Sequence, residues 1–350
     1  MQSIKRMTEF NQSFNGDAKS VYKKMQDWHR ANKPTDGVFF QSHDIPTCSP
    51  EIEKSMAQSA MLFLKTRSTG NKQLQDTIKD QYGLHLFGTW RNTLGIYKID
   101  RDILMELIKA PIPNDTPSHI FSRLPDWCVY VEIITDEEVR GGETGLLGFW
   151  ALLDRMPHVK TGSVLGLHIV PHINHSNPAL NSNYLPIQMA LSEDLTVLEA
   201  IELVRESNDE LVGFFGADPS IKRQNAEENK GVLLNLLPLL LWLCAEEPDI
   251  SNIKGEPVSG SSMRAPKYGI NKKTGAFVPP NHPTVYHLGS RLGGELRRFN
   301  DKIDKPDDSS ATSRKRPHIR RGHWHGVWRG TGQDKNFHLN WQSAIFVNGK

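Results

Sequence analysis

The apolar stretch GVLLNLLPLLLWLCA, residues 231–245, is the part of this sequence that most restricts how the chain can fold. A helix that spans a bilayer needs about 20 consecutive apolar residues, and this stretch is shorter and contains Asn235 and Pro238. We therefore expect a buried core helix and no membrane span, within a longer helix over residues 220–246. Because proline lacks the amide hydrogen that a helix interior requires, Pro238 should kink this helix or mark a junction.

The overall composition is typical of a soluble globular protein. Of the 350 residues, 37% are hydrophobic and 23% are charged, which suits one large domain or two ordinary ones. The three cysteines, Cys48, Cys128 and Cys244, are far apart and lack CxxC spacing, which favours a reducing compartment. The N-terminus MQSIKRMTEFNQSF lacks the apolar run of a signal peptide, so we expect a cytoplasmic protein.

The N-terminal third has the periodicity of helices. Residues 8–33 place Val21, Met25 and Trp28 on one helical face, and residues 50–68 carry a second apolar stripe. Two further helices are predicted over LQDTIKDQYG and DRDILMELIKA.

The period changes in the middle of the chain. The runs LPDWCVYVEII, GLLGFWALLDRM and SVLGLHIVPHI are rich in aromatic and β-branched residues and are joined by short turns, which predicts antiparallel strands. A further strand should lead into a helix capped by Ser192 or Asp194. We predict a strand that turns into a short helix over TVYHLGSRLGGELRRF, and two final strands, PHIRRGHWHGVWRG and FHLNWQSAIFVNG.

These elements indicate an α+β fold with a helical N-terminal third, an antiparallel strand-rich middle, a long buried helix and a C-terminal β-hairpin. We expect a mainly helical region over residues 1–120 and an α+β core over residues 121–350. That core would end in a basic hairpin over residues 312–350, and one continuous domain is the alternative.

Charge is distributed unevenly along the chain. From Thr312 onward there are eight Lys or Arg residues and one acid, Asp334, so this end carries +7. The total of +2 leaves −5 for the preceding 311 residues. A basic end on a mildly acidic body indicates an anionic partner at that end, or a charged surface that keeps the protein soluble.

The segment RRGHWHGVWRG, residues 320–330, carries the most distinctive side chains of this basic end. In a strand, successive side chains point to opposite faces. One face would hold Arg321, His323, His325, Val327 and Arg329, and the other would hold Arg320, Gly322, Trp324, Gly326 and Trp328. The tryptophan face, with Trp341 of the last strand, suits packing in a core, and its glycines leave room for the rings. The His/Arg face suits solvent or an anion.

Four interpretations of this segment remain open. Contact with RNA or another partner would use Arg320, Arg321, His323, His325 and Arg329. A metal-independent ribonuclease would move protons through His323 or His325 and stabilise the phosphorane with an arginine such as Arg321. No spacing is diagnostic of catalysis, so an enzyme is the minority interpretation. A metal site is disfavoured, because no cysteine or carboxylate accompanies the histidines and arginines repel a cation. In the plainest interpretation, the charges are simply solvated.

Elsewhere the chemical signals are weak. His168, His172 and His175 lie across a predicted strand end and turn, where a metal site is again disfavoured. The sequence contains no GxSxG, HExxH or DxDxDG motif. We expect neither a metal nor a cofactor.

Several segments together resemble a known family. They are LLPLLLWLCAEEPDI, TVYHLGSRLGGELR, RKRPHIRRGHWHGVWRG and LNWQSAIFVNG, and the likeness is clearest over residues 225–350. The family occurs in phages, plasmids and other bacterial mobile elements. Its best-known members are type V-A anti-CRISPR proteins, of the large AcrVA kind that lowers expression of the type V-A effector nuclease, Cas twelve-a.

The resemblance implies a recognition protein that acts during translation. Members of this kind are thought to bind the N-terminal segment of the effector as it emerges from the ribosome, and to promote loss of the mRNA. Such a role needs a groove or sheet edge for an extended peptide and a second surface for mRNA, the ribosome or a host nuclease. The alternatives are an RNA-binding or ribonuclease-like regulator that uses the C-terminal Arg/His/Trp face, and a non-catalytic plasmid maintenance protein.

Overall fold

The centre of the protein is a seven-stranded mixed sheet with the strand order β5-β4-β3-β2-β1-β7-β6. The computed structural model describes residues 2–14, 16–66, 72–133, 144–158, 162–175, 184, 186–203, 219–258, 271, 273, 278–303, 318–332, 335–343 and 345–347. The sheet strands are β1 (Gly95–Ile99), β2 (Cys128–Ile133), β3 (Thr144–His158), β4 (Gly162–His175), β5 (Ile187–Ala190), β6 (Ile250–Asn252) and β7 (Thr284–Leu288).

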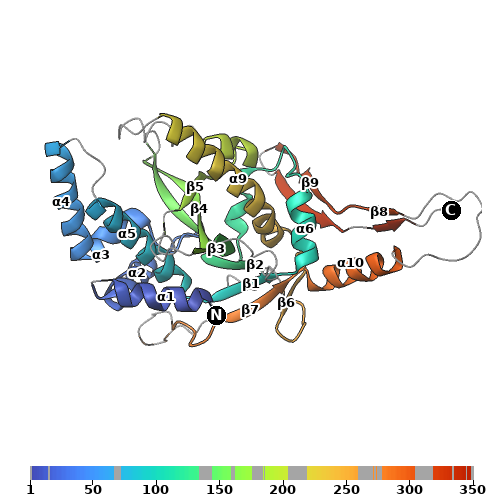
Figure 1. Cartoon of the computed structure of the whole chain (residues 1–350), viewed down its shortest axis with the longest axis horizontal. Helices are drawn as coiled ribbons and strands as arrows, with labels where there is room; N and C mark the ends of the chain where they lie inside the picture. Colours follow the sequence, from blue (N-terminus) through green and yellow to red (C-terminus); the bar gives the residue numbers. More distant parts are fainter. Residues whose placement is uncertain are drawn as a thin grey trace, which may run out of the picture.

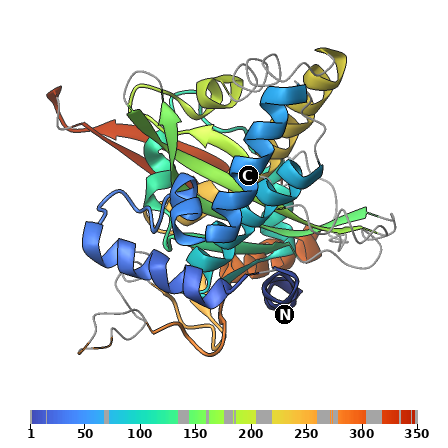
Figure 2. The same ribbon diagram turned by 90° about the vertical axis from the view of Figure 1, so that its left-hand side faces the viewer.

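Helices cover both faces of this sheet (Figures 1 and 2). One face carries α1 (Gln2–Ser13), α2 (Ala18–Asn32), the 3-10 helix η1 (Ser42–Asp44), α3 (Ile45–Cys48), α4 (Pro50–Thr66) and α5 (Lys72–Trp90). The other face carries α6 (Arg101–Lys109), the 3-10 helix η2 (Ser118–Arg123), a helix over residues 197–203, α9 (Pro219–Cys244) and α10 (Ser290–Ile303). The α+β class predicted from the sequence is therefore confirmed.

The sheet separates two hydrophobic cores. In β2, Val129 and Val131 face the core that contains α9, whereas Cys128 and Tyr130 face the core formed with the N-terminal helices. This alternation follows from the period of two in a strand. Because both faces are buried, the central strands are apolar almost throughout, as strands covered on both sides usually are.

The antiparallel strands of the middle are confirmed, and a parallel centre adds to them. Strands β2, β3, β4 and β5 pair antiparallel in sequence order. Strand β1, which lies in the N-terminal third that we expected to be helical, pairs parallel with both β2 and β7. It joins residues 1–120 to the sheet of residues 121–350, and the boundary between those two regions stays a prediction.

Helix α9 is the expected buried helix, and it continues through Pro238 without a junction. Its residues 236–244 are all buried, including Leu237, Leu240 and Trp242. Proline leaves the carbonyl four residues earlier without its helical donor, and here that carbonyl belongs to Leu234. Leu234 is 39% exposed, so this carbonyl lies on the side of the helix that solvent reaches, and the helix tolerates the proline.

Two local predictions need correction. The single helix expected over residues 8–33 is two helices, because Gly16 interrupts it and the Asp17 side chain accepts a hydrogen bond from Lys19 N at 3.1 Å, which caps α2. The helix over residues 197–203 is capped by Thr196, and not by Ser192 or Asp194. Thr196 Oγ1 accepts from Glu199 N at 3.2 Å, while Glu199 Oε2 accepts from Thr196 N at 2.9 Å, a capping box.

None of the described helices combines the length and the apolar character that crossing a bilayer requires. Cys48, Cys128 and Cys244 are all buried free thiols.

Candidate functional site

The basic C-terminal segment forms two short antiparallel ladders that extend from the body of the protein (Figure 1). The strands are β8 (His318–Arg320), β9 (His323–Arg329), β10 (Asn336–Gln342) and β11 (Ile345–Val347). Strand β9 pairs with β10, and β8 pairs with β11. The two long strands expected from the sequence are therefore each interrupted once, at Arg321 and Gly322 in the first and after Gln342 in the second.

One face of the β9–β10 ladder packs against the body through a cluster of tryptophans. Trp324 and Trp341 are direct cross-strand partners, and their ring centroids lie 5.0 Å apart with the rings at 73°. Trp242 of α9 lies 6.5 Å from the Trp324 ring and 5.9 Å from the Trp341 ring. Trp324 is 6% exposed. Aromatic rings carry large apolar area and favour such edge-to-face contacts, so this face anchors the hairpin.

Glycines make room for these rings, as the pattern predicts. A Cβ atom on Gly322 would lie 2.4 Å from a ring carbon of Trp341, and one on Gly326 would lie 2.5 Å from the Phe337 ring. Trp328 differs from the expectation of a core residue. Its ring contacts Phe337 edge-on at 5.2 Å, yet it is 43% exposed, because it lies near the free end of the ladder.

Polar contacts fix the register of β10 on the body. Arg123 of η2 donates from Nη2 to the carbonyl of Phe337 at 2.6 Å, and Glu246 donates from its backbone N to the carbonyl of Leu339 at 3.1 Å. His338 Nδ1 also forms an ion-pair contact with the Glu246 carboxylate. The hairpin is thus held at a defined position, and its outer face has a defined composition.

The outer face carries the side chains expected to contact a partner. Arg321, His323, His325 and Arg329 are all exposed. Their cross-strand partners on β10 include Asn336, Asn340 and Gln342, which adds amide donors and acceptors. The backbone of Arg320 pairs with Ile345, and its side chain lies outside the described part of the structure. Guanidinium, imidazole and amide groups on one open strand surface can bind phosphate oxygens and stack on bases.

Metal and catalytic interpretations find less support in this geometry. The described residues contain no group of three or more His, Cys, Asp or Glu side chains that could hold a metal ion. His338, a possible fourth imidazole for such a site by sequence, is engaged with Glu246. The imidazoles of His323 and His325 are exposed on a strand face, whereas a general acid or base is usually held in a hollow that tunes its pKa.

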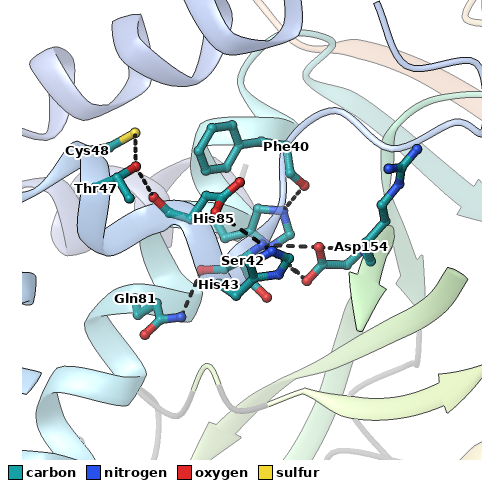
Figure 3. Close-up of polar contacts among 10 residues, drawn as sticks. Phe40, Ser42, His43, Thr47, Cys48, Gln81, His85 and Asp154 are labelled. Atoms are coloured by element: carbon teal, nitrogen blue, oxygen red, sulfur yellow. Dashed lines mark hydrogen bonds and ion pairs between the residues drawn. The ribbon is translucent and has the colours of Figure 1, made fainter. Parts of the chain in front are cut away.

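Sequence reasoning missed a buried polar cluster between the N-terminal helices and the sheet (Figure 3). Asp154 of β3 is completely buried, and its Oδ1 accepts hydrogen bonds from the backbone N of Ser42 at 3.1 Å and of Arg155 at 2.7 Å. Its Oδ2 lies 3.8 Å from His85 Nδ1 and 3.6 Å from His168 Nδ1. The signal was a single acid in the apolar run GFWALLDRM.

This cluster links two layers of the fold. Ser42 belongs to η1, His85 to α5 and Asp154 to β3, and His85 Nε2 also lies 2.9 Å from the Phe40 carbonyl oxygen. Gln81 Nε2 donates to the Ser42 carbonyl at 2.8 Å. A buried carboxylate is tolerated when several donors surround it, so Asp154 fastens the N-terminal layer to the sheet.

Burial controls the protonation of the groups in and near this cluster. Burial raises the pKa of the Asp154 carboxyl, but His85, His168 and hydrogen bonds from Ser42 lower it, and the net pKa is below its usual value. Burial lowers the pKa of His168 to about 4 against the opposing effect of Asp154. On the same strand, burial and the Arg6 guanidinium lower the pKa of His172 to about 3, and His172 Nδ1 lies 2.8 Å from the Tyr130 hydroxyl. These histidines are structural groups and not an open metal site.

Comparison with known proteins identifies the family. The model of the AcrVA2-like family, described as "Anti-CRISPR type V subtype A2 family", matches residues 97–349. This chain belongs to the AcrVA2-like anti-CRISPR family. A solved structure described as "Crystal structure of AcrVA2" is 37% identical, with a TM-score of 0.71 over 99% of both chains. A search of the curated proteins finds no match.

The region matched by the AcrVA2-like family model begins within β1 and includes the whole C-terminal hairpin. The helices α1 to α5 precede it, although the similarity to the solved structure extends over them as well. The resemblance read from the C-terminal motifs is therefore confirmed, and a type V CRISPR system is the target that the family name implies.

Proposed function

We propose that this AcrVA2-like protein suppresses synthesis of the type V-A effector nuclease in the bacterial cytoplasm. It recognises the N-terminal peptide of the effector as that peptide leaves the ribosome, and it causes loss of the mRNA being translated. Membership of the AcrVA2-like family, with 37% identity to AcrVA2 over 99% of the chain, is the observation that carries this proposal.

The His/Arg face of the hairpin supports the second half of this function. Arg321, His323, His325 and Arg329 are exposed on a ladder whose opposite face is anchored in the core. Cations and planar groups on an open surface suit the mRNA, ribosomal RNA or an acidic nuclease partner. Contact, and not cleavage, is the role that we assign to this face.

Co-expression with recoded effector genes tests the proposal. Effector protein and effector mRNA should both fall when this protein is present. Changing the N-terminal amino acids of the effector should abolish that loss, whereas synonymous codons that keep the same amino acids should preserve it. An effector gene with a stop codon directly after its start codon serves as a control, because its mRNA does not yield the recognised peptide and should not respond to this protein.

Direct RNA recognition through the same face is the second candidate, favoured by the exposure of His323 and His325 beside arginines. If synonymous changes relieve the silencing, the protein reads the RNA and the peptide proposal is wrong. Degradation of RNA by the purified protein without ribosomes would identify a ribonuclease. The Arg321→Ala and His323→Ala double variant should lose silencing under either candidate, so it tests the face and not the choice between them.

A further inference from the structure

An apolar groove lies on the surface between the helix of residues 197–203 and the N-terminal half of α9. Its volume is about 620 Å³, within the range of about 300–1,000 Å³ that is typical of ligand pockets. It is lined by five apolar and three charged side chains: Leu195, Leu198, Ile201, Leu203, Leu234, Glu199, Glu202 and Lys230. The groove is therefore unlike the His/Arg face, which is mainly polar.

Two leucines of this groove are exposed although their neighbours are buried. Leu234 is 39% exposed and Leu203 is 38% exposed, whereas Leu233 and Leu236 on the same helix α9 lie in the core. Apolar side chains gathered in a hollow and bordered by charges are typical of a binding surface. Scattered single leucines on a surface would need no such explanation.

The charges at the border of the groove have defined roles. Lys230 of α9 pairs with Glu202, so these two charges cancel across the groove. Glu199 Oε2 accepts both the backbone N and the hydroxyl of Thr196 at 2.9 Å, and those hydrogen bonds lower the pKa of Glu199. Glu199 is therefore ionised at neutral pH and gives the groove a net negative charge.

We infer that this groove binds an apolar segment of the effector's N-terminal peptide, with a lysine or arginine of that segment placed against Glu199. The inference rests on the proposed function, which requires a peptide site. The leucines match apolar side chains, the carboxylate of Glu199 matches a cation, and an acidic peptide would be repelled. Figure 1 shows the N-terminal half of α9 at the top of the molecule and the basic hairpin on its right, so peptide and RNA would occupy separate surfaces.

Binding of a synthetic peptide with the effector's N-terminal sequence to the purified full-length protein tests the groove. The Leu234→Asp variant places a carboxylate among the leucines and should weaken binding at least about tenfold, because that charge loses hydration when the peptide covers it. Ile253→Asp is the matched control. Ile253 is 73% exposed in the turn after β6 and is not part of the groove, so this variant should bind the peptide as the wild type does.

A second variant removes the charge and keeps the fold. In Glu199→Gln the amide oxygen still accepts from Thr196, so the helix cap is preserved. Peptide binding should weaken several-fold and lose part of its dependence on salt concentration, because one ion pair is removed. This variant remains informative if Leu234→Asp lowers the melting temperature.

The outcomes separate this inference from the proposed function. If recoding the effector's N-terminus abolishes silencing but both groove variants bind the peptide like the wild type, the groove assignment is wrong and the function stands. A dimer that dissociates in Leu234→Asp, with unchanged peptide affinity, would also overturn the assignment, since a second copy would then fill the groove. Absence of peptide binding by the wild type overturns the groove in every case, and overturns the function too if recoding has no effect.

Discussion

Replacing His168 with glutamine should change how stability depends on pH. Burial lowers the pKa of His168 to about 4, whereas a histidine in an unfolded chain titrates near about 6.5. As pH falls below that value, the unfolded chain takes up a proton that the folded protein still refuses. The folded state therefore loses stability through the window from about pH 6.5 to about pH 4.

The size of this effect follows from the difference between the two pKa values. At about 1.4 kcal/mol per pKa unit, acidification from pH 7 to pH 4 should remove about 3 kcal/mol of unfolding free energy through His168 alone. Asp154 acts mainly below this window, because its own pKa is lowered and its stabilisation disappears only as pH falls through that value. His172 contributes in the same direction as His168, while Asp80, whose pKa is raised to about 6 by burial and by Asp76 and Glu51, opposes them.

Urea unfolding followed by tryptophan fluorescence at several pH values measures this difference. Comparing wild type with His168→Gln at each pH cancels the contributions of His172, Asp80 and other shared groups. The gap between the two proteins should shift by about 3 kcal/mol between pH 7 and pH 4 in favour of the variant. Ile169→Val, a packing change at the next position of β4, should give a gap that is independent of pH. A constant gap for His168→Gln would refute the reasoning.

Two further predictions concern the C-terminal hairpin. Trp324→Ala removes a ring that packs on Trp242 and Trp341 and should cost about 3–5 kcal/mol of unfolding free energy, whereas the Arg321→Ala and His323→Ala double variant should stay within about 0.5 kcal/mol of wild type; thermal and urea denaturation measure both, and the reverse order would mean that the two faces are wrongly assigned. Gly326→Ala brings a Cβ atom to 2.5 Å from the Phe337 ring, so that ring must move and stability should fall by about 1–3 kcal/mol; an unchanged melting temperature would show that the ring has free space.

The parts of the fold that the sequence predicts are those with strong local periodicity. The helix that becomes α9 and the strands β2, β3 and β4 are visible as long apolar or alternating runs. Strand β1 was missed because it is five residues long and owes its conformation to partners in β2 and β7, the second of which lies about 190 residues away. Local propensity cannot reveal such a pairing.

The candidate sites show the same division between local and distant information. The two faces of β9 follow from the alternation of side chains in one strand, so the sequence alone assigns residues such as His323 and Trp324 to opposite faces. The Asp154 cluster combines η1, α5, β3 and β4, and the groove combines the helix of residues 197–203 with α9. Their members are far apart in sequence, and only the packing of the layers brings them together.

The strand conformation of β9 explains how one short segment can both anchor and recognise. In a helix, successive residues turn by about 100°, so Trp324 and Trp328 would share their side of the helix with His325 and Arg321. In a strand the period is two, and every second residue lies on the same face. Trp324 and Gly326 can then face the core while His323 and His325 face outward. A shift of the β9–β10 pairing by one residue would expose the tryptophans and bury the cations, so the Trp324–Trp341 contact that stabilises the hairpin also fixes which side chains a partner meets.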